Sequence, residues 1–287
     1  MSTPNLETVS ETLFLPLFAL AIGSREADPI LRDERAMALA DSILEMNRDS
    51  GNPLFARLAA GRLPRALIVS LSLRMRRFDE YVRTFLASQP DGVIVNLGCG
   101  LDVRRHRVDN GRMRWFDLDL PEVIALRRSL LDETDRMRFI ASSVTENAWL
   151  SALPDEPGER FMFLAEGLFM YLPEAEVRSL VAGIAGARPG SELVAEVAAR
   201  RIVSLMHTRF GRGKFRRQFG FAHDVVYSSG LSDSAEIESF AAGVRLLDEW
   251  TYFDDGDARL GWMRWFARWD LFGRAQWTIH ARLGQSG

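Results

Sequence analysis

A glycine pair and an acid are spaced as in a nucleoside-binding site. Gly98 and Gly100 follow an apolar run that begins at Val93, and Asp119 follows the next such run. Glycines give the main chain conformational freedom and leave room for a ligand to approach it. In α/β folds, an acid after the second strand accepts hydrogen bonds from the ribose hydroxyls. The glycines and the acid together therefore predict a site for a nucleoside.

Two further apolar runs also end in polar groups. Ser143 and Val144 follow the third run, and Glu166 follows the fourth. The carboxyl ends of parallel strands meet at one edge of a sheet, where α/β proteins bind ligands. Taken alone, Asp119 could instead cap the helix that begins at Pro121, and Glu166 could cap a later helix.

The nucleoside does not have to carry a pyrophosphate. The third glycine of the dinucleotide-binding pattern is replaced by Val103, which disfavours a dehydrogenase. The arrangement suits S-adenosyl-L-methionine, which has a ribose and an adenine but no phosphate.

Strands and helices alternate through the middle of the chain. Short apolar runs predict strands at residues 93–97, 112–118, 138–141, 161–165 and 192–197, and two late strands at 244–253 and 275–283. Helical patterns separate the first five runs, which is typical of βαβ units in a parallel sheet. We predict a single α/β domain over residues 1–287, with a seven-stranded, mainly parallel, Rossmann-like sheet. Within it we expect a helical cap (1–90), a cofactor-binding core (91–204), a lid insertion (205–243) and C-terminal strands with a helix (244–287).

The helix predicted at residues 71–86 places one arginine beside its apolar face. Helical spacing puts Arg74 at the border of that face, and puts Arg76 and Arg83 on the solvated side. A charge at the border usually extends to water, but Arg74 could instead point over the sheet at an anionic group. Residues 101–108 predict a short helix with a basic surface.

Two aromatic segments near the end of the chain have alternative interpretations. Basic and aromatic residues between 205 and 235 could bind single-stranded nucleic acid, although the net charge of −3 disfavours this. A solvated loop is the default, and a substrate lid is the functional alternative. Trp262, Trp265, Phe266 and Trp269 follow helical spacing and predict an apolar helix face packed on the core.

Composition excludes several classes of protein. The only cysteine, Cys99, rules out an intramolecular disulfide framework and fits a reducing compartment. No Cys/His cluster has the spacing of a metal site. The apolar run at 13–22 is too short to span a membrane and follows acidic rather than basic residues. We expect a cytoplasmic protein with a small-molecule substrate, no nucleic acid or membrane partner, and an oligomeric state that the sequence leaves undefined.

Several segments in this order resemble the leucine carboxyl methyltransferase family of class I S-adenosylmethionine-dependent methyltransferases, and especially its bacterial branch of polyketide carboxyl methyltransferases. The resemblance rests on V-N-L-G-C-G-L-D (95–102), D-L-D-L-P-E-V-I (117–124), S-S-V-T-E-N-A-W-L (142–150) and A-E-G-L-F-M-Y-L-P (165–173). The segments L-L-D-E-W-T-Y-F-D (246–254) and R-L-G-W-M-R (259–264) extend it. The chain departs from the family at Val103, where threonine is frequent, and at 18–21, which carries no basic residue.

The resemblance implies roles for individual residues. Arg74 would pair with the methionine carboxylate of the cofactor, Asp119 would hold its ribose, and Glu166 would lie near its amino group. Tyr171 would lie on the substrate side, and Arg200 joins it as a candidate substrate-binding residue. The full set implied for cofactor binding is Arg74, Gly98, Cys99, Gly100, Asp119, Leu120, Ser143, Val144, Glu166 and Gly167.

These expectations favour methyl transfer from S-adenosyl-L-methionine to an oxygen, and most of all to a carboxylate of a small molecule such as a polyketide. A carboxylate is ionised at neutral pH, so it needs no base and only has to be held in line with the methyl group. We therefore assign no catalytic residue and expect catalysis to come from proximity and orientation. Hydroxyl methylation is the alternative chemistry. A cofactor-binding scaffold or regulator without activity is the alternative of another class.

Overall fold

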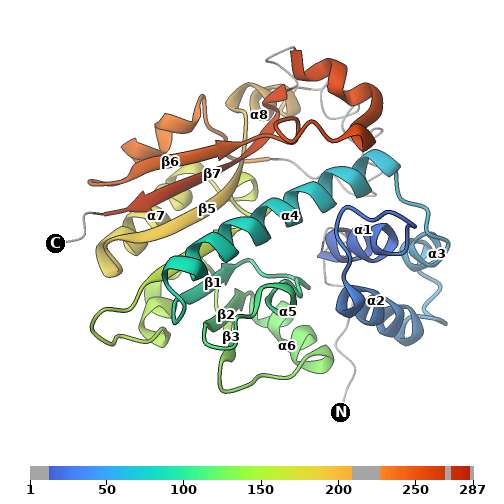
Figure 1. Cartoon of the computed structure of the whole chain (residues 1–287), viewed down its shortest axis with the longest axis horizontal. Coiled ribbons are helices and arrows are strands. Elements are labelled where there is room, and N and C mark those ends of the chain that lie inside the picture. Colours follow the sequence, from blue (N-terminus) through green and yellow to red (C-terminus); the bar gives the residue numbers. More distant parts are fainter. Residues whose placement is uncertain (1–12, 209–226, 269–272, 285–287) are drawn as a thin grey trace.

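The computed structural model describes residues 13–208, 227–268 and 273–284. Its centre is one seven-stranded sheet in the order β3-β2-β1-β4-β5-β7-β6 (Figure 1). The bounds are β1 (Val93–Leu97), β2 (Arg114–Asp119), β3 (Met137–Ala141), β4 (Phe161–Ala165), β5 (Ser191–Ala198), β6 (Arg245–Trp250) and β7 (Gln276–Leu283). Strands β1 to β5 are parallel, and β7 runs antiparallel to both β5 and β6. The predicted seven-stranded, mainly parallel sheet is confirmed.

Alternating side chains of the central strands pack in two different hydrophobic clusters, one on each face of the sheet. Ile94 of β1 packs in the cluster formed by α4 (Arg65–Ser88), whereas Val93 and Val95 pack in the cluster that contains α7 (Glu174–Ala187). All five residues of β1 are buried, as expected for a central parallel strand covered on both faces. The remaining helices between the strands are α5 (Arg105–Val108), α6 (Pro121–Leu130) and α8 (Arg200–Met206), with 3-10 turns at Asn147–Ala152, Phe169–Tyr171, Ser234–Ser239 and Ala258–Arg268.

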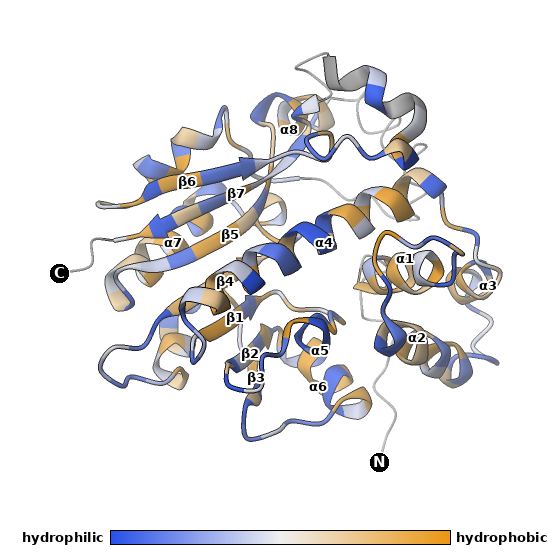
Figure 2. Cartoon of the chain, in the orientation of Figure 1, coloured by the Kyte–Doolittle hydropathy of each residue, from blue (hydrophilic) through white to orange (hydrophobic). Residues whose placement is uncertain are grey.

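The N-terminal part of the described chain is helical, as predicted. Helices α1 (Phe14–Ser24), α2 (Glu34–Met46) and α3 (Pro53–Ala59) share a hydrophobic cluster with residues of α4, of the segment after the glycine turn and of α6. Figure 2 shows how densely hydrophobic residues cover α1. Asp33 and Asn52 start α2 and α3, because each side chain accepts a hydrogen bond from a main-chain N–H of the first turn. Helix α4 is longer than the predicted segment at 71–86, since Pro64 starts it and no residue interrupts it before Ser88.

Two predictions about basic residues are wrong. Residues 101–108 form a helix only at Arg105–Val108, and its surroundings are not a basic surface, because Arg104 and Arg105 are buried. Arg76 is only partly exposed and pairs with Asp255 at 2.8 Å, so it is not on a freely solvated side. Arg104 and Arg76 are each reached by an acid from a distant segment, Asp79 and Asp255, which helical spacing does not reveal.

The prediction for residues 262–269 is also wrong where it can be compared. The described part of the segment forms 3-10 turns that follow a kink at Gly261, and Trp265 is 75% exposed. Trp269 lies outside the described residues. The predicted lid (205–243) falls largely on residues 209–226, which also lie outside them. Its later part joins the main core, where Leu231 and Ile237 are buried. No helix in the described ranges is long and apolar enough to cross a membrane.

Candidate active site

The glycine turn and Asp119 meet at the carboxyl edge of the sheet. Gly98 and Gly100 both have positive φ, at 63° and 51°, which explains why glycine is needed there. Asp119 accepts a hydrogen bond from the N–H of Gly100 at 2.7 Å and from that of Leu120 at 2.8 Å. Burial raises the pKa of this carboxyl, and the two N–H groups oppose the shift. Each carboxylate oxygen accepts one bond and keeps a lone pair for another donor.

These residues fit a ribose and an adenine. Asp119 offers free acceptor capacity at a strand end, and beside it Leu120 exposes 44% of its surface, which is unusual for a large apolar residue. Ser143 lies at the end of β3, with its hydroxyl 2.8 Å from that of Thr145. Val144 has its side chain in the main core, so only its main chain can meet a ligand. The Cys99 side chain likewise points into the core.

Arg127 is buried under the glycine turn and binds its main chain. Its guanidinium donates to the carbonyl of Gly100 at 3.0 Å, to the carbonyl of Asp102 at 2.7 Å and to the carboxylate of Asp117 at 2.5 Å. Arg127 and Asp117 are both fully buried. The pair therefore fixes the turn that the ligand would approach. Apart from the acid in the second strand, no sequence pattern points to it.

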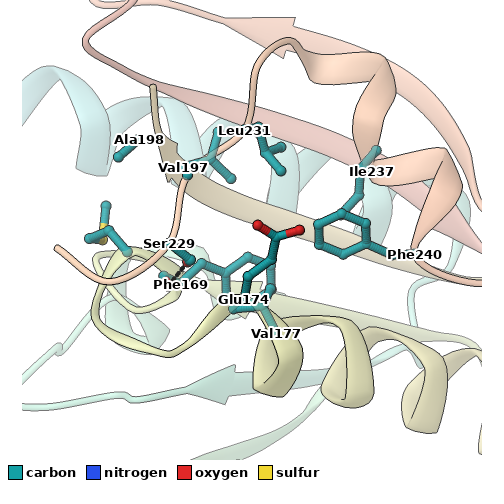
Figure 3. A pocket seen from close by; sticks show the side chains of 11 residues that line it. Phe169, Glu174, Val177, Val197, Ala198, Ser229, Leu231, Ile237 and Phe240 are labelled. Carbon is teal, nitrogen blue, oxygen red and sulfur yellow. Dashed lines mark hydrogen bonds between the residues drawn. The ribbon is translucent and has the colours of Figure 1, made fainter. Parts of the chain in front are cut away.

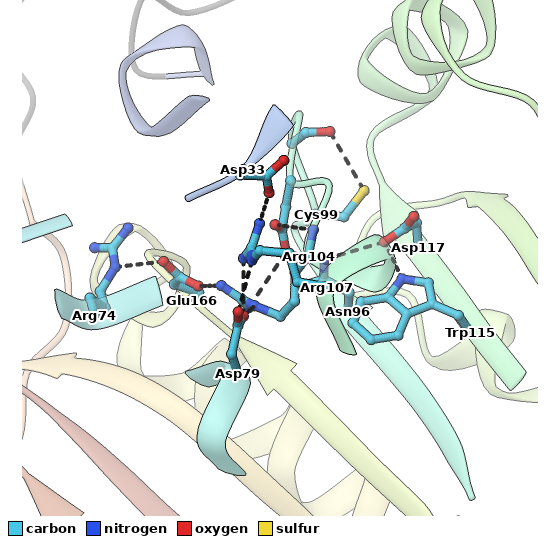
Figure 4. A network of polar contacts seen from close by, with 12 residues as sticks. Asp33, Arg74, Asp79, Asn96, Cys99, Arg104, Arg107, Trp115, Asp117 and Glu166 are labelled. Atoms are coloured by element: carbon cyan, nitrogen blue, oxygen red, sulfur yellow. Dashed lines mark hydrogen bonds and ion pairs between the residues drawn. The ribbon is translucent and has the colours of Figure 1, made fainter. Parts of the chain in front are cut away.

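Arg74 and Glu166, 92 residues apart in sequence, pair directly with each other. The Nε of Arg74 donates to Oε1 of Glu166 at 2.7 Å, and about a tenth of each side chain is exposed. The other oxygen of Glu166 accepts a hydrogen bond from Arg104 (Figure 4). Burial would raise the pKa of Glu166, but the charges of Arg104 and Arg74 outweigh it and lower the pKa to about 2.

The ion-pair network continues from Arg104 into the helical cap. Arg104 donates to Asp79 of α4 at 2.8 Å, and Arg107 donates to the same carboxylate. Arg107 also reaches Asp33, which starts α2 (Figure 4). This buried chain of charges was missed at the level of sequence, because its members come from three separate segments.

Glu196 is a second acid that sequence reasoning missed. It lies near the end of β5, is fully buried, and accepts from Nη1 of Arg74 at 2.6 Å. Its other oxygen accepts from the hydroxyl of Tyr252 at 2.6 Å. Gly167 lies beside this pair: a Cβ there would lie 3.7 Å from Nη2 of Arg74, which is an ordinary contact distance. Glycine is favoured at this position by its φ of 63°, and the guanidinium of Arg74 lies next to it.

The two candidate substrate residues have different surroundings. Tyr171 is 41% exposed and packs edge-to-face against Tyr227, with 5.5 Å between the ring centroids. Arg200 instead donates to the carboxylates of Glu174 and Glu236. Its guanidinium is therefore already paired. A substrate role for Arg200 stays a prediction, and it would require one of these pairs to open.

A small, mostly apolar pocket lies between α7 and the end of β5. The Glu174 carboxylate enters it among Phe169, Val197 and Phe240 (Figure 3). The described residues contain no group of three His, Cys, Asp or Glu side chains that could hold a metal ion.

The sequence model for leucine carboxyl methyltransferase matches residues 15–185, which is more than half of the chain. The chain belongs to the leucine carboxyl methyltransferase family. It is a methyltransferase that uses S-adenosyl-L-methionine, as predicted from the resemblance. The matched range contains every residue in the predicted cofactor set.

Relatives cover nearly the whole chain. The tetracenomycin polyketide synthesis O-methyltransferase of Streptomyces glaucescens is 30% identical over 90% of this chain and 89% of its own length. The S-adenosyl-L-methionine-dependent methyltransferase dpfgK of Gibberella zeae is 29% identical over 97% and 94%. Among solved structures, a candidate methyltransferase from Thermobifida fusca covers 94% of each chain with a TM-score of 0.53 at 15% identity. A DUF574 family protein from Streptomyces avermitilis gives 0.54 over 93% and 96%, also at 15% identity. These two structures support the fold.

Proposed function

We propose that this family member forms a methyl ester on the carboxylate of a small molecule, in the cytoplasm. The observation that carries the proposal is the family match over residues 15–185 together with the charged group built by Arg74, Glu166 and Glu196 at the strand ends. Small natural-product acids such as polyketides are the favoured acceptors, since a relative of similar length acts in polyketide synthesis.

Each residue of the site has a part in binding. S-adenosyl-L-methionine, when bound, supplies an electrophilic methyl group on a sulfonium. Asp119 would accept hydrogen bonds from the ribose hydroxyls, and Gly98 and Gly100 would let the ligand approach the turn. Arg74 would hold the methionine carboxylate with the donors that Glu166 and Glu196 leave over, and Glu166 would accept from the amino group.

A carboxylate acceptor agrees with the side chains near this edge. Burial raises the pKa of Tyr171 and of Tyr252, so both phenols are protonated at neutral pH and act as donors rather than as bases. His207 of the neighbouring turn donates its Nε2–H to the carbonyl of Tyr227 at 3.0 Å. An ionised carboxylate needs no base, whereas a hydroxyl acceptor would need one. Catalysis would then rest on holding the acceptor oxygen in line with the methyl group.

The test is methyl transfer from labelled cofactor to a panel of small carboxylic acids and matching alcohols, followed by mass spectrometry. We expect products that gain one methyl group from acids and none from the alcohols. Asp119→Asn serves as the matched variant that loses cofactor binding. Transfer to alcohols alone would support the hydroxyl chemistry. Tight cofactor binding without transfer to any acceptor would support the scaffold alternative.

A further inference from the structure

The acceptor has to approach from the side of the sheet next to the reacting end of the cofactor. Asp119 follows β2, and Glu166 with Gly167 follows β4, so the residues for the ribose and for the methionine end lie in that order along one edge. The next strands along that edge are β5 and then β7. Because β7 is antiparallel, its first residue, Gln276, pairs with the last residue of β5, Ala198. The start of β7 therefore borders the acceptor side.

Tyr227 is fixed at this place by its neighbours. The N–H of Ser228 donates to the carbonyl of Met170 at 2.7 Å, and the hydroxyl of Ser229 donates to the carbonyl of Phe169 at 2.7 Å. These bonds tie the segment to the 3-10 turn that carries Tyr171. Gln276 completes the arrangement, since its Nε2 donates to the hydroxyl oxygen of Tyr227 at 2.5 Å.

The direction of the bond from Gln276 decides whether the Tyr227 hydroxyl can donate a hydrogen bond to another group. A phenol has one proton and two lone pairs. Because the oxygen of Tyr227 accepts from the amide of Gln276, its own proton points away from that amide, toward the hydroxyl of Tyr171 or toward a ligand that takes its place. Burial, with the negative charge of Glu196 nearby, raises the pKa of Tyr227, so the proton is kept at neutral pH. The edge-to-face contact with Tyr171 places a second protonated phenol beside it.

We propose that Tyr227, oriented by Gln276, donates a hydrogen bond to the carboxylate of the methyl acceptor next to Tyr171. Neutral donors suit this task, because they hold one carboxylate oxygen while the other remains free to attack the methyl group. Tyr227 and Gln276 both lie beyond the range matched by the family model, residues 15–185. The proposal rests on the proposed function and assigns the residues that bind its acceptor.

Titration of 2-naphthoate into the complex with S-adenosylhomocysteine tests the assignment without turnover. Tyr227→Phe should weaken naphthoate binding about tenfold to a hundredfold, as for loss of a hydrogen bond to a charged group. Its affinity for S-adenosylhomocysteine should stay within about twofold, which also shows that the variant is folded. Tyr81→Phe is the matched control, since its phenol donates to Asp248 and should not affect either ligand.

Gln276→Glu tests whether Gln276 acts by orienting the Tyr227 hydroxyl or only by packing against it. A carboxylate at 276 would accept from Tyr227 and turn the phenol proton away from the ligand, so naphthoate should bind as weakly as to Tyr227→Phe. The double variant should bind little worse than either single variant. If wild type binds naphthoate and both single variants bind it equally well, the assignment is overturned while the proposed function stands. If wild type neither binds nor methylates any acid of the panel, both are overturned.

Discussion

Arg74 and Glu196 are 122 residues apart in sequence and join α4 to the end of β5 through a bond of 2.6 Å. Glu166 takes a second bond from the same guanidinium. One arginine therefore balances two buried carboxylates while its remaining donors lie beside Gly167. The same side chain supports the fold and, in the proposed function, the cofactor, so its removal should affect both.

Two arginines on one helix should respond differently to removal. Arg74→Ala would leave two buried carboxylates short of a partner and should cost about 3–5 kcal/mol of unfolding free energy, as well as cofactor affinity. Arg76→Ala breaks a partly exposed pair with Asp255 and should cost about 1 kcal/mol or less. Denaturant unfolding and calorimetry with S-adenosylhomocysteine measure both effects. Equal losses for the two variants would refute the role of Arg74.

Asp119→Asn should weaken binding of S-adenosylhomocysteine about tenfold to a hundredfold. The reason is the loss of charge-assisted bonds to the ribose, each worth about 1.5–3 kcal/mol. Glu122→Gln is the control, because it removes an exposed negative charge close by without touching the strand end. Calorimetry that finds the same affinity for wild type and Asp119→Asn would remove Asp119 from the site.

Cofactor affinity should depend on the ionisation of Asp119. Burial raises its pKa, and only the ionised form can accept on both oxygens. Affinity for S-adenosylhomocysteine should therefore fall as the pH decreases toward that raised pKa, and the fall should begin at a higher pH than for an ordinary aspartate. The titration of the ligand itself affects wild type and Asp119→Asn equally. The difference between their pH profiles of affinity therefore reports the ionisation of Asp119 alone. Parallel profiles would contradict the prediction.

Glu166 should make the stability of the fold sensitive to acid, because its pKa is shifted downward, in the direction opposite to that of Asp119. Its pKa in the folded state is about 2, below the ordinary value of 4.5. The stabilisation by Glu166 is therefore complete above about pH 4.5 and is lost as the pH falls toward 2. Glu166→Gln should lower the unfolding free energy at neutral pH, and the gap from wild type should narrow across this window. Acid unfolding followed by circular dichroism tests this, and a gap that stays constant would contradict it.

The strands and the ligand-facing edge could be predicted from the sequence because their signals are local. Short apolar runs that end at Gly98, Asp119 and Glu166 fix both the strand and its carboxyl end. Tertiary contacts could not be found in this way. Arg104 follows a solvated-looking basic pattern, yet it is buried between Asp79 and Glu166.

The same reason explains why sequence patterns did not reveal Glu196, the exposure of Trp265 or the contacts of Tyr227. Glu196 lies inside a strand, and its partner Arg74 lies in a helix far earlier in the chain. Trp265 fits an apolar helical stripe, but in the 3-10 turns that follow Gly261 its side chain is exposed rather than packed on the core. A role for Tyr227 can be inferred only from the fold, which places it next to Tyr171 and Gln276.

Alkaline treatment of the labelled product tests the carboxyl assignment most directly. With S-adenosyl-L-methionine labelled in the methyl group and an acid that the enzyme accepts, we expect mild alkali to release the label as methanol, because esters hydrolyse where methyl ethers do not. The rate of methyl transfer should also stay flat from weakly acidic to weakly alkaline pH, since the acceptor is ionised throughout. Label that survives alkali, with a rate that rises through the pKa of a base, would contradict methyl ester formation.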